Sequence, residues 1–333
     1  MTPSAAWRQA PALLAAAAAG AVQTLAFFQP AAWPLPLLAI ALLAGLVGQA
    51  TPRRAAALGW VFGCAWLGAA TWWLFISLHR YGGLPAPLAV AAVALLSGLL
   101  SVYLALGLAW VARQRRGRPM LDASRFAAAW LAAELARGVW FTGFPWAATG
   151  YSQVDGPLAV LAPWIGVYAT GALVAWVAAC VGMGLAAALG RHPSRVGGGA
   201  VARGQPAQAR RAWLPVLLGL AVLALPAVWQ AVRGAPDFTQ PSGTLRVALL
   251  QTNVAQDEKF AAQHLPATLA WVAQALLAAD ADLVLAPETA VPLLPDQLAD
   301  LAPGYWAALA AHFGQPGGPA ALIGVSLGSY GEG

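Results

Sequence analysis

The stretch Leu84–Val111, LPAPLAVAAVALLSGLLSVYLALGLAWV, contains 28 residues and no charged side chain. A helix needs about 20 consecutive apolar residues to cross the hydrocarbon core of a bilayer. This stretch is therefore long enough to cross with a tilt or to extend past the membrane surface. It predicts a transmembrane helix and makes a membrane protein the first hypothesis for the chain.

Other apolar runs extend this interpretation to the first two-thirds of the sequence. The whole chain is 60% hydrophobic and only 9% charged, whereas a soluble domain carries about 25% charged residues. The second run is short, and the first has too weak a basic flank to be a cleaved signal peptide. The sequence predicts an α-helical transmembrane bundle in residues 1–233, with about seven spans: Pro11–Phe28, Leu35–Ala50, Ala55–Ser77, Leu84–Val111, Ser124–Phe141, Leu158–Leu189 and Ala212–Val232.

The arginines are distributed unevenly among the loops, although the formal charge is +6. Loops rich in arginine stay in the cytoplasm. We therefore expect a multi-pass protein of the bacterial inner membrane, with a cytoplasmic N-terminus and, after seven spans, a periplasmic C-terminal part. The same placement argues against nucleic acid as a partner. The loops after the second, fourth and sixth runs carry Arg53, Arg54, Arg113, Arg115, Arg116, Arg118, Arg191, Arg195, Arg203, Arg210 and Arg211, whereas the alternate loops carry Arg80 and Arg233.

The character of the sequence changes at Gly243, after a linker at 234–242. Short apolar strands alternate with helical segments, which predicts an α/β domain with a largely parallel sheet. Three strands leave exposed edges, so we expect 243–333 to be the start of a truncated domain that does not fold stably alone. The expected strands are Leu245–Leu250, Asp282–Ala286 and Ala320–Leu327, and the expected helices are Ala261–Leu277 and Pro295–Phe313.

Two loops on the predicted periplasmic side hold candidate substrate-binding residues. SLHRYGG at 77–83 contains His79 and Tyr81, and the segment from TGFPW at 142–146 to GYSQ at 150–153 contains Phe144, Trp146 and Tyr151.

Glu134 and Arg137 precede the second of these loops, one helical turn apart, where they are able to pair. Charged residues within a membrane span are costly and suggest a functional role. A structural ion pair with aromatic anchoring of the loop and a lipid-facing or substrate-facing site both remain open.

The C-terminal part holds a second group of polar residues near the ends of two expected strands. Gln251, Asn253 and Lys259 follow the first strand, and Glu288 follows the second. Ligands of α/β sheets bind at the carboxyl ends of the strands. Glu288 is therefore a candidate general base, although a loop carboxylate or a helix-start acid fits as well.

The two cysteines, Cys64 and Cys180, lie in apolar runs without a CxxC or histidine partner, so no metal site and no cofactor are predicted.

Several motifs in order resemble the apolipoprotein N-acyltransferase family over nearly the whole chain. They are Leu25–Phe27, Gly59–Gly63, SLHRYGG at 77–83, TGFPW at 142–146 with GYSQ at 150–153, Ala162-Pro163 with Gly166–Tyr168, LRVALLQTNVAQDEKF at 245–260 and LVLAPETAVP at 283–292. The resemblance implies eight membrane helices and a periplasmic nitrilase-like αββα domain inserted between the seventh and the eighth.

The resemblance also implies the chemistry. An acyl chain from a membrane phospholipid is transferred to the N-terminal diacylglyceryl-cysteine of an apolipoprotein, through a thioester formed by a Glu–Lys–Cys triad. Glu288 matches the triad glutamate, which deprotonates the thiol. Phe260 matches an aromatic position expected to line the lipid channel.

The sequence departs from the family pattern in one respect. No lysine follows Lys259, which precedes Glu288 and does not match the triad lysine, and no cysteine follows Cys180. His264 and His312 are expected to be surface helix residues. The sequence covers the N-terminal two-thirds of the family. We expect it to be a fragment of a longer gene that is inactive alone, and the alternative is a truly truncated gene with an inactive product. The alternatives are a non-enzymatic lipid- or lipoprotein-binding membrane protein and a membrane-tethered carbon–nitrogen hydrolase. A transporter is a weaker third.

Overall fold

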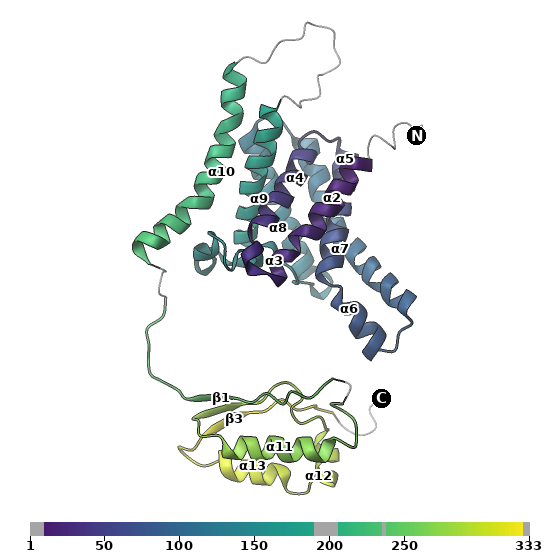
Figure 1. The fold of residues 1–333 in the computed structure, drawn as a ribbon, viewed down its shortest axis with the longest axis vertical. Coiled ribbons are helices and arrows are strands. Elements are labelled where there is room, and N and C mark those ends of the chain that lie inside the picture. The colour runs from purple at the N-terminus through teal and green to yellow at the C-terminus, as the bar shows by residue number, and fades with distance from the viewer. Residues whose placement is uncertain (1–9, 190–205, 235–237, 257, 329–333) are drawn as a thin grey trace. The chain divides into compact units, whose positions relative to one another are not determined.

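The computed structural model describes residues 10–189, 206–234, 238–256 and 258–328. The chain divides into two compact units, Met1–Pro236 and Asp237–Gly333. Each unit has its own hydrophobic core, and each is described by itself (Figure 1).

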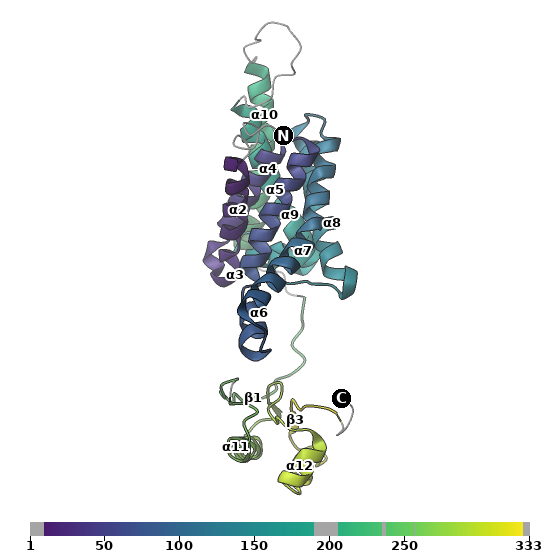
Figure 2. The same ribbon diagram turned by 90° about the vertical axis from the view of Figure 1, so that its right-hand side faces the viewer.

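The first unit is a bundle of helices, as the long apolar runs predict (Figures 1 and 2). Helix α5 lies between α2 and α7, and α9 packs against α4, α8 and α10. The helices are α2 (Ala10–Gln23), α3 (Leu25–Phe28), α4 (Pro34–Val47), α5 (Pro52–Ala70), α6 (Trp73–Ile76), α7 (Ala86–Gln114), α8 (Pro119–Val139), α9 (Ala162–Ala188) and α10 (Pro206–Arg233). Short helical turns are η1 (Pro30–Ala32), η2 (Ser77–Tyr81), η3 (Trp140–Thr142), η4 (Thr149–Gln153) and η5 (Ala159–Leu161).

Five stretches of helix in the described residues are long and apolar enough to cross a membrane: Ala10–Phe28, Pro30–Val47, Ala86–Gln114, Ala159–Ala188 and Trp213–Arg233. The span expected at Ala55–Ser77 is instead two helical segments, Pro52–Ala70 and Trp73–Tyr81, which meet at an angle of 55°. Counting this pair as one span gives six. The span expected at Ser124–Phe141 is covered by α8, which carries four charged residues and is not apolar enough to qualify by composition.

Small residues and aromatic rings together make the core of the bundle. Gly20 faces the backbone of Phe62, and Gly182 faces the backbone of Ala41, so a larger side chain at either glycine would separate two helices. Such close backbone approach is how membrane helices gain packing energy. Trp130 then stacks on Trp66 with ring centroids 5.6 Å apart.

Polar contacts join the loops at one end of the bundle. The guanidinium of Arg115 donates to the carbonyl oxygens of Val47 and Ala50, 3.0 and 3.3 Å away, which joins the α7–α8 loop to the end of α4. The expected arginine loops after α4 and after α7 therefore lie at the same end. Arg191, Arg195 and Arg203 of the third such loop lie outside the described residues, and the side chains of Arg210 and Arg211 are not described either.

The second unit has a three-stranded parallel sheet in the order β1-β2-β3, which confirms the expected parallel pairing. Its elements are β1 (Val247–Leu249), α11 (Leu265–Ala278), β2 (Leu283–Leu285), α12 (Pro295–Leu301), α13 (Tyr305–Phe313) and β3 (Ala320–Leu322). Each strand has only three paired residues, so the strands are shorter than the sequence predicts. The single helix expected at Pro295–Phe313 is wrong, because Gly304 adopts a left-handed conformation with φ of 81° and separates α12 from α13.

The three helices of this unit lie on one face of the sheet (Figure 1). Val284, in the middle of β2, is fully buried against them with Leu269, Val272 and Leu276. On the other face, Leu249 is 74% exposed and Leu322 is 67% exposed. The sheet therefore keeps one covered and one uncovered apolar face within this unit.

An ion pair at the start of β1 predicts how the sheet responds to acid. The Arg246 backbone N–H donates to Asp282 Oδ2 at 2.9 Å, and the Arg246 guanidinium contacts Asp282 Oδ1 at 3.3 Å. The pKa of the Asp282 carboxyl is lowered below its ordinary value of 3.8, mainly by the hydrogen bond from the Arg246 backbone N–H and next by the bond from its guanidinium. Because this pKa is lowered in the folded state, the charged carboxyl stabilises the fold fully at pH values above 3.8. That stabilisation is lost as the pH falls through the folded-state pKa.

We therefore expect the Asp282→Asn variant to exchange its Leu250 and Leu283 backbone amides faster than the wild type at neutral pH. The difference should shrink below pH 3.8, because the wild-type carboxyl is then also losing its charge. Hydrogen exchange of the intact chain, compared at equal pH, measures this. The Asp300→Asn variant, altered at an exposed α12 residue, is the control. A difference that persists at low pH would contradict the assignment.

Candidate functional site

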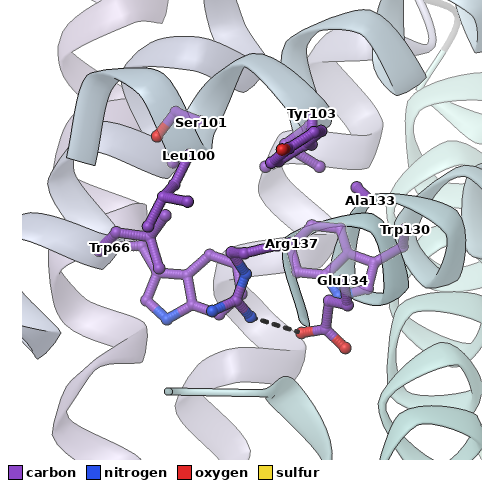
Figure 3. A pocket seen from close by; sticks show the side chains of 11 residues that line it. Trp66, Leu100, Ser101, Tyr103, Trp130, Ala133, Glu134 and Arg137 are labelled. Carbon is purple, nitrogen blue, oxygen red and sulfur yellow. Dashed lines mark ion pairs between the residues drawn. The ribbon is translucent and has the colours of Figure 1, made fainter. Parts of the chain in front are cut away.

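A charged pair is buried inside the membrane bundle, near the end of α8. The side chains of Glu134 and Arg137 are 3% and 4% exposed, and Arg137 Nη2 lies 3.8 Å from Glu134 Oε1. This confirms the pairing expected from their spacing of three residues. Figure 3 shows the Arg137 guanidinium between the carboxylate and the ring of Trp66, whose centroid is 5.4 Å from the guanidinium carbon.

The carboxylate of Glu134 binds a residue that is distant in sequence. Its Oε1 accepts hydrogen bonds from the Thr149 backbone N–H at 2.8 Å and from the Thr149 hydroxyl at 2.7 Å. Trp130 Nε1 donates to the same hydroxyl at 3.1 Å. Glu134 therefore fixes the start of η4, which carries the GYSQ motif.

The guanidinium of Arg137 binds the other loop motif. Arg137 Nη1 donates to the carbonyl oxygen of Phe144 at 3.2 Å and to that of Trp146, while the Phe144 N–H donates to the Arg137 carbonyl at 2.7 Å. The loop between these contacts has an unusual backbone, because Phe141, Thr142 and Ala147 all have positive φ angles. Such conformations cost about 1–3 kcal/mol each and persist only where surrounding contacts enforce them. The buried pair supplies those contacts.

The cavity beside the pair is too small for a substrate. Its free volume is about 20 Å³, and Trp66, Tyr103 and Trp130 line it with the pair (Figure 3). Neither an acyl chain nor a headgroup fits in this space. The geometry therefore favours the structural interpretation of Glu134 and Arg137 over the substrate-facing one: the pair holds the loop beside a cavity too small for a substrate.

The candidate aromatic residues lie on the loop that the pair holds. Phe144 and Trp146 have ring centroids 6.1 Å apart, and Trp146 also contacts Trp73 at 6.4 Å. Trp146 is 50% exposed and Tyr151 is 55% exposed. Trp146 of the TGFPW motif thus reaches the helical segment after α5, and Tyr151 of the GYSQ motif is exposed on the same loop.

His79 and Tyr81 lie on η2, a π-helical turn that follows α6. π-turns within helices are often found at functional sites. His79 Nδ1 lies 2.8 Å from the Leu84 carbonyl oxygen, and its ring lies 5.4 Å from that of Phe75. Phe75 lines an apolar groove of about 550 Å³ between α5, α6 and α7, together with Trp60, Trp72 and Val90. His79 is therefore next to a groove wide enough for an acyl chain.

In the second unit, Glu288 follows β2 at the carboxyl end of the sheet and is exposed. Lys259 Nζ donates to the Glu288 backbone carbonyl at 3.0 Å, so the segment after β1 contacts the turn after β2. Gly324, after β3, lies so close to Glu288 that a Cβ on it would clash with the Glu288 backbone. Segments after all three strands thus meet around Glu288, as expected for parallel strands.

The remaining candidates of this unit are also exposed. Gln251 and Asn253 follow β1, Asn253 has a positive φ of 51°, and Phe260 is 56% exposed. No described hydrogen bond joins the side chains of these residues to Glu288.

Of the two cysteines, Cys64 of α5 lines the groove between α5, α6 and α7, and Cys180 is fully buried in α9. Among the described residues, no three His, Cys, Asp or Glu side chains gather as metal ligands would. His264 begins α11, and His312 lies in the last turn of α13.

Comparison with known proteins gives a consistent result. Residues 19–180 match the family model described as the Apolipoprotein N-acyltransferase N-terminal domain. The chain carries the N-terminal domain of the apolipoprotein N-acyltransferase family. This confirms the resemblance seen in the motifs, and the matched region contains α8, Glu134, Arg137 and both loop motifs of the bundle.

Curated apolipoprotein N-acyltransferases are similar over a longer region. The protein of Verminephrobacter eiseniae is 42% identical over 99% of this chain and 60% of its own length. That of Ralstonia nicotianae is 43% identical over 74% of this chain and 43% of its own, and that of Pseudomonas syringae pv. tomato is 38% identical over 78% and 48%. The chain thus spans 60% or less of the length of these apolipoprotein N-acyltransferases.

Sequence reasoning missed Thr149, Trp130 and Trp66 as partners of the pair. The charged residues within α8 were a usable signal, and Trp130 lies four residues before Glu134 on the same helix. Thr149, 15 residues away on a loop, and Trp66, on another helix, are not identified by any local pattern.

The loop should loosen when the pair is broken. We expect Arg137→Gln to leave the Glu134 carboxylate buried without its counter-charge, which costs about 3 kcal/mol. Exchange of the Phe144 and Thr149 backbone amides should then rise by about a hundredfold. The matched control is Arg125→Gln, which breaks an ion pair of the same spacing with Asp122 at the other end of α8. Equal loop exchange in both variants would show that the pair does not hold the loop.

Proposed function

We propose that this chain forms the membrane part and the base-bearing segment of an enzyme that acylates lipoproteins. In this reaction an acyl chain passes from a membrane phospholipid to the N-terminal diacylglyceryl-cysteine of an apolipoprotein, through a thioester. The observation that carries the proposal is the 42% identity over 99% of the chain with a protein named apolipoprotein N-acyltransferase. The apolar helices support a multi-pass location, which we place in the bacterial inner membrane.

The proposed acyl-donor site is the groove between α5, α6 and α7. Its volume of about 550 Å³ and its aromatic lining suit an acyl chain. Burying each CH₂ group is worth about 0.8 kcal/mol, so a site within the membrane avoids moving a long chain into water. His79, whose ring lies beside Phe75 of the groove, would then meet the polar part of the donor lipid, with Tyr81 two residues further along η2.

The proposed acceptor surface is the loop that carries Phe144, Trp146 and Tyr151. Exposed aromatic rings at a membrane interface combine an apolar body with a polar edge. Such a surface suits the lipid-modified N-terminus of an apolipoprotein. The two described arginine-rich loops, after α4 and after α7, lie at the other end of the bundle. From the positive-inside rule we therefore propose that this surface, and the second unit after Arg233, are periplasmic.

We propose that the second unit is the start of a nitrilase-like αββα domain, with the boundaries 234–242 for the linker and 243–333 for the domain. The uncovered apolar face of its sheet, with Leu249 and Leu322, is the face on which an αββα fold packs its second sheet. Glu288 is the proposed general base that deprotonates the nucleophilic thiol. Gln251, Asn253 and Phe260 are proposed to face the substrate.

The proposed thiol is not among residues 1–333. Cys64 and Cys180 lie in membrane helices, and Lys259 binds the Glu288 backbone carbonyl rather than its carboxylate. We therefore expect residues 1–333 by themselves to bind lipid and lipoprotein without transferring an acyl chain. The position of both cysteines in membrane helices, and of Lys259 on the Glu288 backbone carbonyl, also favours the alternative, a non-enzymatic lipid- or lipoprotein-binding protein.

A chimaera tests the role of Glu288. Residues 1–333 joined to the remaining sequence of the Verminephrobacter eiseniae relative should transfer acyl chains from phospholipid to a diacylglyceryl-lipopeptide. Glu288→Gln should lower the rate by about 10²–10⁴-fold, because the thiol then lacks its base. The control is Glu258→Gln, an exposed carboxylate one residue before Lys259.

Equal rates in the two variants would remove Glu288 from the mechanism. A folded chimaera that binds both lipids but transfers nothing would support the binding-protein alternative, and one that releases ammonia from small amides would support a carbon–nitrogen hydrolase.

A further inference from the structure

A second apolar groove lies on the bundle between α7 and α8, which run side by side in Figures 1 and 2. Its volume is about 380 Å³. The α8 wall consists of alanines, including Ala128, Ala132 and Ala136, while Tyr103 and Trp110 of α7 line the opposite wall. It is separate from the groove proposed for the acyl donor, which involves α5, α6 and the first half of α7.

The helical repeat places an arginine at the same end of both walls. Residues three or four positions apart share one face of a helix. On α7 the row Tyr103, Leu106, Trp110 continues to Arg113. On α8 the row read towards the N-terminus, Ala136, Ala132, Ala128, continues to Arg125. Each apolar wall therefore ends, one turn further, in a cationic side chain.

Arg125 belongs to a basic rim in which hydrogen bonds join the ends of the two helices. The Arg125 guanidinium donates to the Gln114 carbonyl oxygen at 2.7 Å and pairs with Asp122 at 3.0 Å, which ties the end of α7 to the start of α8. Asp122 also accepts the backbone N–H groups of Arg116 and Arg118.

Three other arginines near this rim are available to a ligand, whereas Arg125 is bonded to Gln114 and Asp122. Arg113, Arg116 and Arg118 are exposed. Arg113 forms no ion pair or side-chain hydrogen bond with another residue in the described part of the chain. The rim thus has more positive charge than Asp122 neutralises.

We propose that this groove and its basic rim bind an anionic phospholipid of the leaflet that the α7–α8 loop faces. One acyl chain lies along the alanine wall, and the lipid phosphate lies against Arg113 with Arg116 or Arg118 beside it. The wall from Ala128 to Ala136 is about 12 Å long, which is close to half of the hydrocarbon core of about 30 Å. Basic residues next to a membrane surface attract anionic lipids.

Two features distinguish a lipid from a free phosphate at this site. The groove is almost wholly apolar, so it contributes affinity only to a ligand with a hydrocarbon chain. The arginines contribute affinity only to a negative headgroup. A lipid with both parts should bind best, and each part is removable separately by substitution. The site is independent of the proposed acyl transfer, which uses other residues.

Native mass spectrometry of the detergent-purified chain tests the proposal. The chain is titrated with phosphatidylglycerol, with phosphatidylcholine of the same acyl chains, and with glycerol phosphate as a tail-free competitor. Arg113→Gln should lower phosphatidylglycerol binding about fivefold and leave phosphatidylcholine binding unchanged. Ala132→Leu, which fills the groove from an exposed position, should weaken both lipids.

The matched controls are Arg233→Gln, an exposed arginine at the end of α10, and Ala91→Leu, an exposed alanine of α7 outside both grooves. Neither should change lipid binding. Equal binding of the two lipids by the wild type, or an Ala132→Leu variant that binds like Ala91→Leu, would overturn the proposal. Competition by glycerol phosphate would also overturn it, because the site would then recognise phosphate alone.

Discussion

The buried pair of Glu134 and Arg137 is the constraint on which the loop after α8, and so this end of the bundle, depends. Two charges in a membrane helix are costly unless each is paired and its remaining polar atoms are bonded. Here the loop after α8 binds one atom of each partner: Glu134 Oε1 binds Thr149, and Arg137 Nη1 binds the carbonyls of Phe144 and Trp146, while Glu134 Oε2 and Arg137 Nη2 are buried without a hydrogen bond among the described residues. The loop therefore has to fold back onto the bundle for the charges to be tolerated.

This constraint connects three features that would otherwise be separate. It makes α8 the least apolar of the long helices in the described chain, it stabilises positive φ angles at Phe141 and Thr142, and it places Phe144 and Trp146 together on the surface. At the other end of α8, Asp122 and Arg125 repeat the same spacing and fix the basic loop instead. One helix thus organises both ends of the bundle through two short-range ion pairs.

Sequence patterns predicted what depends on local composition. Long apolar runs gave the helices of the bundle, the spacing of Glu134 and Arg137 gave their pairing, and alternating strands and helices gave the parallel sheet. Local patterns did not predict the bend between α5 and α6 or the role of Thr149, which depends on a distant contact. The break at Gly304 had a local signal, the Pro303-Gly304 dipeptide, which the prediction of a single helix overlooked. The position of Glu288 near Lys259 and Gly324 also depends on the sheet, and its chemistry stays a prediction.

The most direct test of the buried pair is a double-mutant cycle on the unfolding of the chain in detergent. Glu134→Gln and Arg137→Gln are measured separately and together. If the pair is the constraint described here, each single variant loses much of its unfolding free energy. The double variant then loses less than the sum of the two single losses, by about 1 kcal/mol or more. If the two effects add to within about 0.5 kcal/mol, the charges act independently and the pair does not organise the bundle.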